Sequence, residues 1–274
     1  CIAQNLARES WLAPVLHRWR QEKIPVLFVK GAALARTIYA RPGMRCMSDI
    51  DVLVPADLCD RAVRSAESLG GELRVPRDRW ASTRMDYAFP VRVGGVVVEI
   101  HRTLAPRNLF SPDLPALFAQ ARVLDDGVLV PRPVDHFVLL AVHAAKHGLV
   151  VPFRSLVDGV LLARAEKLDP MEVVATARAW RAVRATAVWI AVLERFGLLG
   201  DGWRPARLRL ADSRRVAGLA LGAPWSTASR WDRVVRIGAL LDERGRFVRH
   251  IGERVGLGAV DLVMRYFSRE ARRC

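Results

Sequence analysis

Acidic and apolar side chains alternate along the segment Asp-Ile-Asp-Val-Leu-Val that begins at Asp49. Successive side chains of a β-strand point to opposite faces, so Asp49 and Asp51 share one face. Ile50, Val52 and Val54 share the other face, which has to pack against a core. Two carboxylates on one strand face repel each other unless a cation lies between them. The segment therefore predicts a half-buried strand whose acidic face is a candidate metal site.

Strand and helix patterns divide the chain near residue 130. Apolar spacing predicts an early helix over 3–22 and helices over 32–39 and 56–69, the last closed by Gly70-Gly71. Strands are expected over 26–29, 50–54, 87–93 and 96–101, with Gly94-Gly95 as a hairpin turn. After Pro133 the pattern is helical, over 134–147, 153–166, 170–179 and 181–196, and more weakly near 229–243 and 258–272. We therefore expect an α+β protein with an α/β region at 1–130 and a helical region at 131–274.

A third acidic residue lies on the last expected strand. Alternation places Val97, Glu99 and His101 on one face of that strand, where an unpaired acid among apolar residues would be costly. Three carboxylates from neighbouring strands provide the hard oxygen ligands that Mg²⁺ or Mn²⁺ prefers. Such a set predicts a two-metal site, in which one ion activates an attacking hydroxyl and the other stabilises leaving pyrophosphate.

The expected strand over 26–29 runs through Lys30-Gly31 directly into a helix. A glycine at such a junction leaves backbone N–H groups at the helix start available to a phosphate. Lys30 adds positive charge at the same point. A tight turn with a solvated lysine is the alternative, and the acidic strand downstream favours the phosphate site.

Several motifs follow one another in a fixed order along residues 10–165. The motifs are Lys30-Gly31-Ala32-Ala33-Leu34, Tyr39, Arg45, the segment 49–54, Glu99-Ile100-His101, the segment 143–148 and Asp158. This order resembles the polymerase-β-like nucleotidyltransferase superfamily and, more narrowly, the bacterial family of uncharacterised nucleotidyltransferases. The block R-x-x-x-D-I-D-x-L-V, which starts at Arg45, is the most specific part of the resemblance.

The resemblance implies a polymerase-β-like core, a small mixed sheet with flanking helices, whose cleft the C-terminal helical region completes. It implies transfer of a nucleoside monophosphate from an NTP to a hydroxyl or phosphate acceptor, with Asp49, Asp51 and Glu99 as catalytic metal ligands. Gly31 would let the backbone approach the triphosphate, and Lys30 or Arg45 would neutralise it. Ala32 departs from the wider superfamily, where a serine commonly follows the glycine.

Three further residues are candidates for nucleotide contact. His143 and His147 lie four residues apart on one expected helix face, with Lys146 beside them. Contact with phosphate or base is favoured over zinc, because the HExxH glutamate is missing. Packing in the core is an equal alternative. His101 faces the acidic site, where it orients Glu99, assists proton transfer or simply neighbours the acid.

Composition bounds the cellular setting and the partners. The net charge is +15, and most of the excess lies in residues 138–274, which favours polyanions or a solvated arginine-rich surface about equally. The four cysteines lack paired or metal-ligand spacing, which favours free thiols in a reducing cytoplasm. No apolar run approaches the ~18 residues of a membrane span. A cytoplasmic protein without a membrane partner is expected.

Two other classes of function stay open. One is a non-catalytic nucleotide- or RNA-binding regulator on the same fold. The other is a zinc hydrolase built on His101, His143 and His147. For the enzyme, ATP is the expected NTP, although no base-reading motif is present, and the acceptor is a small molecule, a protein, a peptide or an RNA.

Overall fold

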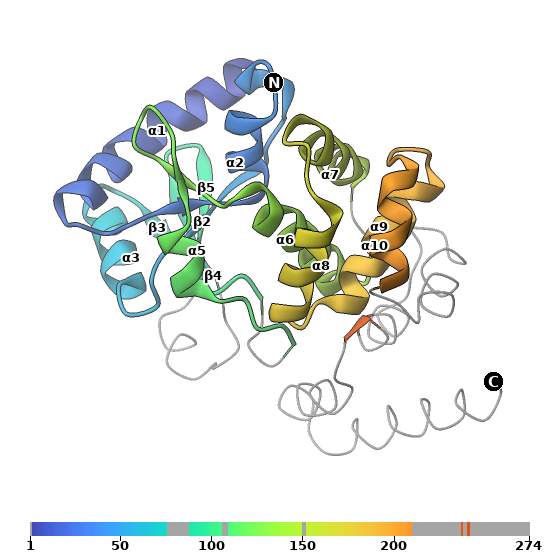
Figure 1. Cartoon of the computed structure of the whole chain (residues 1–274). Helices are drawn as coiled ribbons and strands as arrows, with labels where there is room; N and C mark the ends of the chain where they lie inside the picture. Colours follow the sequence, from blue (N-terminus) through green and yellow to red (C-terminus); the bar gives the residue numbers. More distant parts are fainter. Residues whose placement is uncertain are drawn as a thin grey trace, which may run out of the picture. The chain divides into compact units, whose positions relative to one another are not determined.

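Seven short strands form one mixed sheet (Figure 1). The computed structural model describes residues 2–75, 88–105, 109–149 and 152–209, and the single residues 237, 240 and 241. The sheet order is β3-β4-β5-β2-β1-β7-β6. The strands are β1 (Leu27–Phe28), β2 (Asp49–Leu53), β3 (Glu72–Leu73), β4 (Ala88–Val93), β5 (Val96–His101), β6 (Arg122–Val123) and β7 (Leu129–Val130).

Helices precede, interrupt and follow these strands. Those in the first part of the chain are α1 (Ile2–Gln21), α2 (Lys30–Thr37), the 3₁₀ turn η1 (Pro42–Met44), α3 (Cys59–Ser68) and α5 (Leu114–Ala119). Those that follow are α6 (Pro133–Lys146), α7 (Phe153–Ala165), α8 (Pro170–Ala179), α9 (Val183–Arg195), η2 (Asp201–Trp203) and α10 (Arg204–Arg209). The expected α+β class, with a mixed sheet, flanking helices and helices after the core, is confirmed.

The chain folds as two compact units. The first contains Cys1–Pro106, Asp113–Leu139 and Val157–Leu168. The second contains Arg107–Pro112, Leu140–Leu156 and Asp169–Cys274. The sheet and α1, α2 and α3 belong to the first unit. A functional division at residue 130 stays a prediction.

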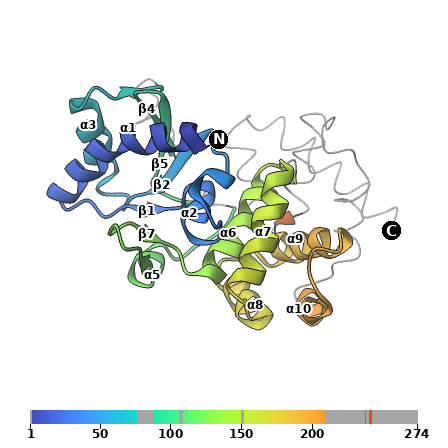
Figure 2. The same cartoon turned by 90° about the horizontal axis from the view of Figure 1, so that it is seen from above.

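The core of the first unit lies under the apolar face of β2. Ile50, Val52 and Val54 are all at most 2% exposed, which confirms the alternation expected from the sequence. Helices α1 and α3 lie side by side over the sheet (Figure 2), and the Trp19 indole of α1 donates a hydrogen bond of 3.0 Å to the Ala62 carbonyl of α3. Burial of this large ring with its N–H satisfied fixes the two helices against the sheet.

Two glycines end α3 as expected. Gly70 has a φ of +83°, the left-handed conformation that glycine adopts freely at a helix end. The Gly71 N–H donates to the Ala66 carbonyl at 3.0 Å, so the chain turns back closely over the helix. A Cβ at Gly71 would lie 2.7 Å from the Ala66 carbonyl oxygen, a contact that only a backbone shift can relieve.

Some features were not expected from the sequence. Strands β3, β6 and β7, of two residues each, and helix α5 carry too little pattern to be recognised. Cys59 is a buried free thiol, as expected, but Cys46 is disulfide-bonded, so the prediction of free thiols is wrong for Cys46. Both weak helices expected near 229–243 and 258–272 fall almost wholly outside the described residues. No helix among the described residues has the length and apolarity to cross a membrane.

Substitution of Gly71 tests the close turn after α3. We expect Gly71→Ala to lower the free energy of unfolding by about 1–3 kcal/mol, because the added methyl group collides with backbone. Urea denaturation measures the loss. Gly200→Ala is the control, since a Cβ at Gly200 has nothing within 4 Å. Equal stability of the two variants would contradict the packing described.

Candidate active site

The pairing of β2 with β5 builds the acidic site. The two strands are parallel neighbours, and Asp51 is directly opposite Glu99 in the register. His101 lies two residues after Glu99 and therefore on the same face of β5. Because the opposite faces of both strands are buried in apolar packing, the polar side chains have to converge on this face.

Asp51 is the centre of the site and is only 6% exposed. Its Oδ1 accepts hydrogen bonds from the Lys30 ammonium at 2.5 Å and from His101 Nε2 at 2.7 Å. Burial acts to raise the pKa of Asp51. The charge of Lys30 and the hydrogen bond from His101 outweigh burial and hold that pKa far below its usual range. Asp51 is therefore ionised although its side chain is buried.

The two carboxylates and the imidazole suit a divalent cation. One ligand atom from each of Asp51, Glu99 and His101 lies within 4.8 Å of the others. His101 Nε2 is 3.4 Å from Glu99 Oε2 as well as close to Asp51. Glu99 is the more open acid, with 34% of its side chain exposed. This donor set of carboxylate oxygens and one imidazole nitrogen is appropriate for Mg²⁺, Mn²⁺ or Zn²⁺.

Asp49 lies apart from that cluster. It begins β2 on the same strand face as Asp51, and its Oδ1 accepts a hydrogen bond of 2.9 Å from the Ser48 hydroxyl. It is half-buried and is not one of the three clustered ligands. The structure thus brings together two of the three predicted carboxylates and adds His101. A metal-binding role for Asp49 stays a prediction.

The junction of β1 and α2 places Lys30 and Gly31 beside the acidic site. Lys30 has a φ of +51°, a left-handed conformation that is strained for a residue with a side chain. Val29 precedes the helix and supplies no side-chain cap, and the Val29 N–H donates to the Asp51 carbonyl at 3.1 Å. No side chain caps the start of this eight-residue helix, so the N–H groups of its first turn can donate to an anion.

Arg45 is held by an acid that lies far away in the sequence. Its Nε and Nη2 both donate at 2.8 Å to the Asp158 carboxylate, and Tyr39 donates to Oδ1 of the same acid at 2.7 Å. Asp158 is 1% exposed and Arg45 8%. Burial, followed by the hydrogen bond to Asp158 and its negative charge, raises the pKa of Tyr39 well above the usual value. The guanidinium of Arg45 is thus paired with Asp158, and contact of Arg45 with a phosphate stays a prediction.

The same guanidinium lies close to Gly31. A Cβ at Gly31 would lie 3.2 Å from Arg45 Nη2 and 3.3 Å from its Cζ. Such contacts are tighter than about nine in ten real Cβ contacts, so an alanine would press on a group that Asp158 holds. The Arg45 guanidinium therefore supports the Lys30–Gly31 turn at Gly31.

His136 supports the turn from α6. Its ring is fully buried and hydrogen-bonds to the backbone of Lys30, while its Nε2 makes no hydrogen bond within the described residues. Burial lowers the pKa of His136 to about 3, although the hydrogen bond to Lys30 acts in the opposite direction. The ring is therefore neutral and acts as a fixed support.

Comparison with protein families matches residues 1–197 to the family described as uncharacterised nucleotidyltransferase. The chain belongs to this family. The family resemblance inferred from the sequence motifs is thereby confirmed. No curated protein matches this nucleotidyltransferase.

Two solved structures of ANT(2'')-Ia are similar to this nucleotidyltransferase. The solution structure of that antibiotic-resistance factor is 14% identical and matches over 70% of this chain and 98% of that one, with a TM-score of 0.47. The crystal structure in complex with adenylyl-2''-tobramycin is 15% identical. It matches over 63% of this chain and 99% of that one, with a TM-score of 0.46.

The remaining predicted contacts lie at the end of α6, in the second compact unit. The rings of His143 and His147 are edge to face, with their centroids 4.6 Å apart. His147 is exposed, and Lys146 and His143 are half-buried. The cluster of potential metal ligands among the described residues does not include this pair. Contact of the three residues with a nucleotide stays a prediction.

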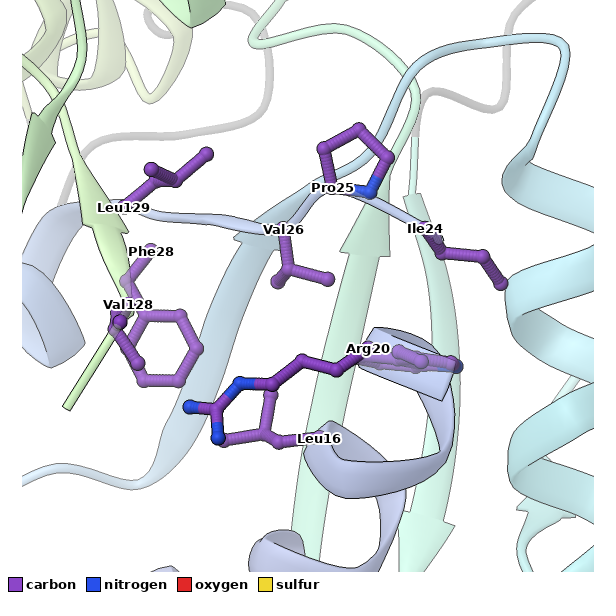
Figure 3. A pocket seen from close by; sticks show the side chains of 10 residues that line it. Leu16, Arg20, Ile24, Pro25, Val26, Phe28, Val128 and Leu129 are labelled. Carbon is purple, nitrogen blue, oxygen red and sulfur yellow. The ribbon is translucent and has the colours of Figure 1, made fainter. Parts of the chain in front are cut away.

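A small hollow lies between α1, β1 and β7 of the first unit (Figure 3). Its volume is about 180 Å³, and apolar side chains such as Leu16, Phe28 and Leu129 line most of it. Arg20 crosses its edge and donates to the Asp126 carbonyl at 2.5 Å. The hollow contains no acid or histidine, so it lacks the groups that nucleotidyl transfer requires.

The supporting roles of two residues, Asp158 and His136, were not predicted from the sequence. Asp158 was recognised as part of the family pattern, but its partner Arg45 lies 113 positions away and no local signal links them. His136 lies within the helix expected over 134–147 and was not singled out. A buried acid and a buried histidine in otherwise apolar helical patterns were the only signals, since each requires a partner.

Removal of the Asp158 charge tests the support of the turn. We expect Asp158→Ala to lower the free energy of unfolding by about 3 kcal/mol or more, because Arg45 is left buried without its partner. Asp60→Ala is the control, since its pair with Arg64 is exposed and worth about 0–1 kcal/mol. Chemical denaturation of both variants gives the comparison. A loss at Asp158 no greater than at Asp60 would contradict the arrangement.

The buried ring of His136 predicts a dependence of stability on pH. The folded pKa of about 3 lies below the ordinary value of 6.5, so protons bind preferentially to the unfolded chain between these values. Stability is therefore complete above pH 6.5 and falls toward pH 3. In this window we expect the wild type to lose up to about 1.4 kcal/mol per pH unit more than His136→Gln does.

Denaturation at stepped pH values measures this difference. Exposed His17 provides the control, because His17→Gln removes a ring that stays in solvent in both states. Parallel stability curves for the wild type and His136→Gln would mean that His136 is not buried in its neutral form.

Proposed function

We propose that this protein transfers a nucleoside monophosphate from an NTP to a hydroxyl or phosphate acceptor, using divalent cations held by Asp51, Glu99 and Asp49. Membership of a nucleotidyltransferase family supports the class of reaction. The single observation that carries the site is the convergence of Asp51, Glu99 and His101 on one face of the β2–β5 pair.

The residues fit the cation that the family's chemistry calls for. Asp51 keeps its charge in a shielded position, and Glu99 lies beside it with a more exposed carboxylate. Mg²⁺ or Mn²⁺ bound here would stabilise negative charge on the attacking and leaving oxygens. Asp49, on the same strand face, is the acid available to extend the site toward a second ion.

The turn before α2 is the proposed binding site of the triphosphate. Gly31 removes the side chain that would hold a phosphate away from the backbone. The uncapped helix start offers N–H donors to phosphate oxygens. Lys30 adds a positive charge at that position.

The proposed reaction is an in-line substitution at the α-phosphorus. The acceptor oxygen forms a bond to the α-phosphorus while the bond from that atom to the bridging oxygen breaks. Pyrophosphate leaves with the electron pair of the broken bond. The acceptor proton passes to Glu99, the more solvent-accessible base of the cluster, and His101 Nε2 is close enough to stabilise that carboxyl group.

Label transfer tests the proposal and identifies the acceptor class. Wild type is incubated with each α-³²P-labelled NTP, ATP first, with Mg²⁺ or Mn²⁺, and with cell extract separated into protein, peptide, RNA and small-molecule fractions. We expect label in one fraction, abolished by EDTA. We expect Asp51→Asn and Glu99→Gln to reduce it about a hundredfold or more, because they weaken the charge stabilisation of the transition state.

Asp60→Asn, which alters an exposed acid outside the site, is the control and should keep full transfer. Transfer by Asp51→Asn at the wild-type rate would contradict the assigned site. NTP binding without transfer to any fraction would favour a non-catalytic regulator instead.

A further inference from the structure

Lys30 pairs with the carboxylate that a cation at Asp51 would bind. We propose that Lys30 is the resident counter-ion of Asp51, which competes with the divalent cation and moves to the triphosphate when the cation binds. This inference rests on the proposed function, since it assumes a metal site at Asp51. The Lys30 ammonium would first pair with Asp51 and then, after the cation binds, with the triphosphate.

The contacts of Asp51 Oδ1 make the competition direct. That oxygen accepts from Lys30 Nζ at 2.5 Å and from His101 Nε2 at 2.7 Å. A carboxylate oxygen has two lone pairs, and these two donors use both. A cation can therefore bind this oxygen only if one donor leaves. The imidazole of His101 can become a metal ligand through Nε2 when its proton lies on Nδ1, whereas an ammonium has no lone pair to offer a metal.

The position of the ion pair makes the competition strong. The side chains of Lys30 and Asp51 are 14% and 8% exposed, so water and salt screen their attraction weakly. A positive charge that remained at this point would also repel an arriving divalent cation. Binding of the cation and departure of the ammonium are therefore coupled.

Only the side chain of Lys30 is free to make this movement. The Lys30 backbone is hydrogen-bonded by His136, and Gly31 lies against the guanidinium that Asp158 fixes. The ammonium, by contrast, sits on a flexible four-carbon stem. Released from Asp51, it remains at the start of α2, where an anionic phosphate is favoured. A rigid turn with one mobile charge thus links metal binding to phosphate binding.

The affinity of the nucleotide-free protein for Mn²⁺ tests the proposal. Lys30→Gln removes the competing charge, and we expect it to bind Mn²⁺ about tenfold or more tightly than wild type. Lys30→Arg keeps the charge and should not bind more tightly than wild type. Lys167→Gln is the matched control, because Lys167 is an exposed lysine that also has a left-handed φ, of +47°, and should leave the affinity unchanged.

Electron paramagnetic resonance of free Mn²⁺ measures these affinities without any need for turnover. Equal or weaker binding by Lys30→Gln, with wild type binding normally, would overturn the role of Lys30 and leave the metal site intact. Absence of Mn²⁺ binding in wild type and in every variant would overturn the metal site itself, and the proposed function with it.

A second measurement uses the wild type, in case Lys30→Gln does not fold. The rate of lysine acetylation is followed by mass spectrometry with and without Mg²⁺. We expect Mg²⁺ to accelerate acetylation of Lys30, because an amine that leaves the buried carboxylate of Asp51 becomes more accessible to the reagent. Exposed Lys23 and Lys167 are internal references whose rates should not change. An unchanged rate at Lys30, in protein that binds Mg²⁺, would contradict the proposal.

Discussion

The parallel pairing of β2 with β5 is the constraint on which the site depends. Asp51 is opposite Glu99, and a slip of one residue would turn one set of side chains into the apolar core. The buried faces prevent that slip, since Ile50, Val52 and Ile100 are at most 2% exposed. The apolar packing that stabilises the sheet therefore also fixes the separation of the two acids. Fold stability and placement of the acidic site come from one register.

A second layer of contacts supports the turn that faces those acids. Asp158 holds Arg45, Arg45 lies under Gly31, and His136 hydrogen-bonds to the backbone of Lys30. None of these three supporting side chains belongs to the cluster of potential metal ligands. Their polar groups are buried, and burial is costly unless partners are present. The protein bears this cost at the point where a strained, left-handed Lys30 has to be held in place.

The strand containing Asp51 and the strand containing Glu99 could be predicted because alternation is a local signal. The same holds for the hairpin at Gly94-Gly95 and for the end of α3 at Gly70. Strands β3, β6 and β7 could not, since two residues are too few to show a period. Cys46 was also mispredicted, because a disulfide depends on distant parts of the chain.

In the site, the sequence pointed to Asp51 and Glu99 as partners and placed His101 on their face. It gave Asp49 equal weight, yet the clustered third group is His101, because side-chain reach and strand twist are not visible in an alternating pattern. It offered Lys30 or Arg45 for the phosphate, which stays a prediction, and it did not indicate that Arg45 pairs with Asp158, 113 positions away. Long-range ion pairs of this kind are invisible to any local reading of the chain.

The central claim is that Asp51 is a ligand of the catalytic cation. The most direct measurement is anomalous diffraction from crystals grown with Mn²⁺ and a non-hydrolysable NTP analogue. We predict a manganese peak at bonding distance, about 2.1–2.2 Å, from an Asp51 oxygen and close to Glu99, with the Lys30 ammonium on a phosphate oxygen. A manganese peak that is bound only elsewhere, with Lys30 still paired to Asp51, would contradict it.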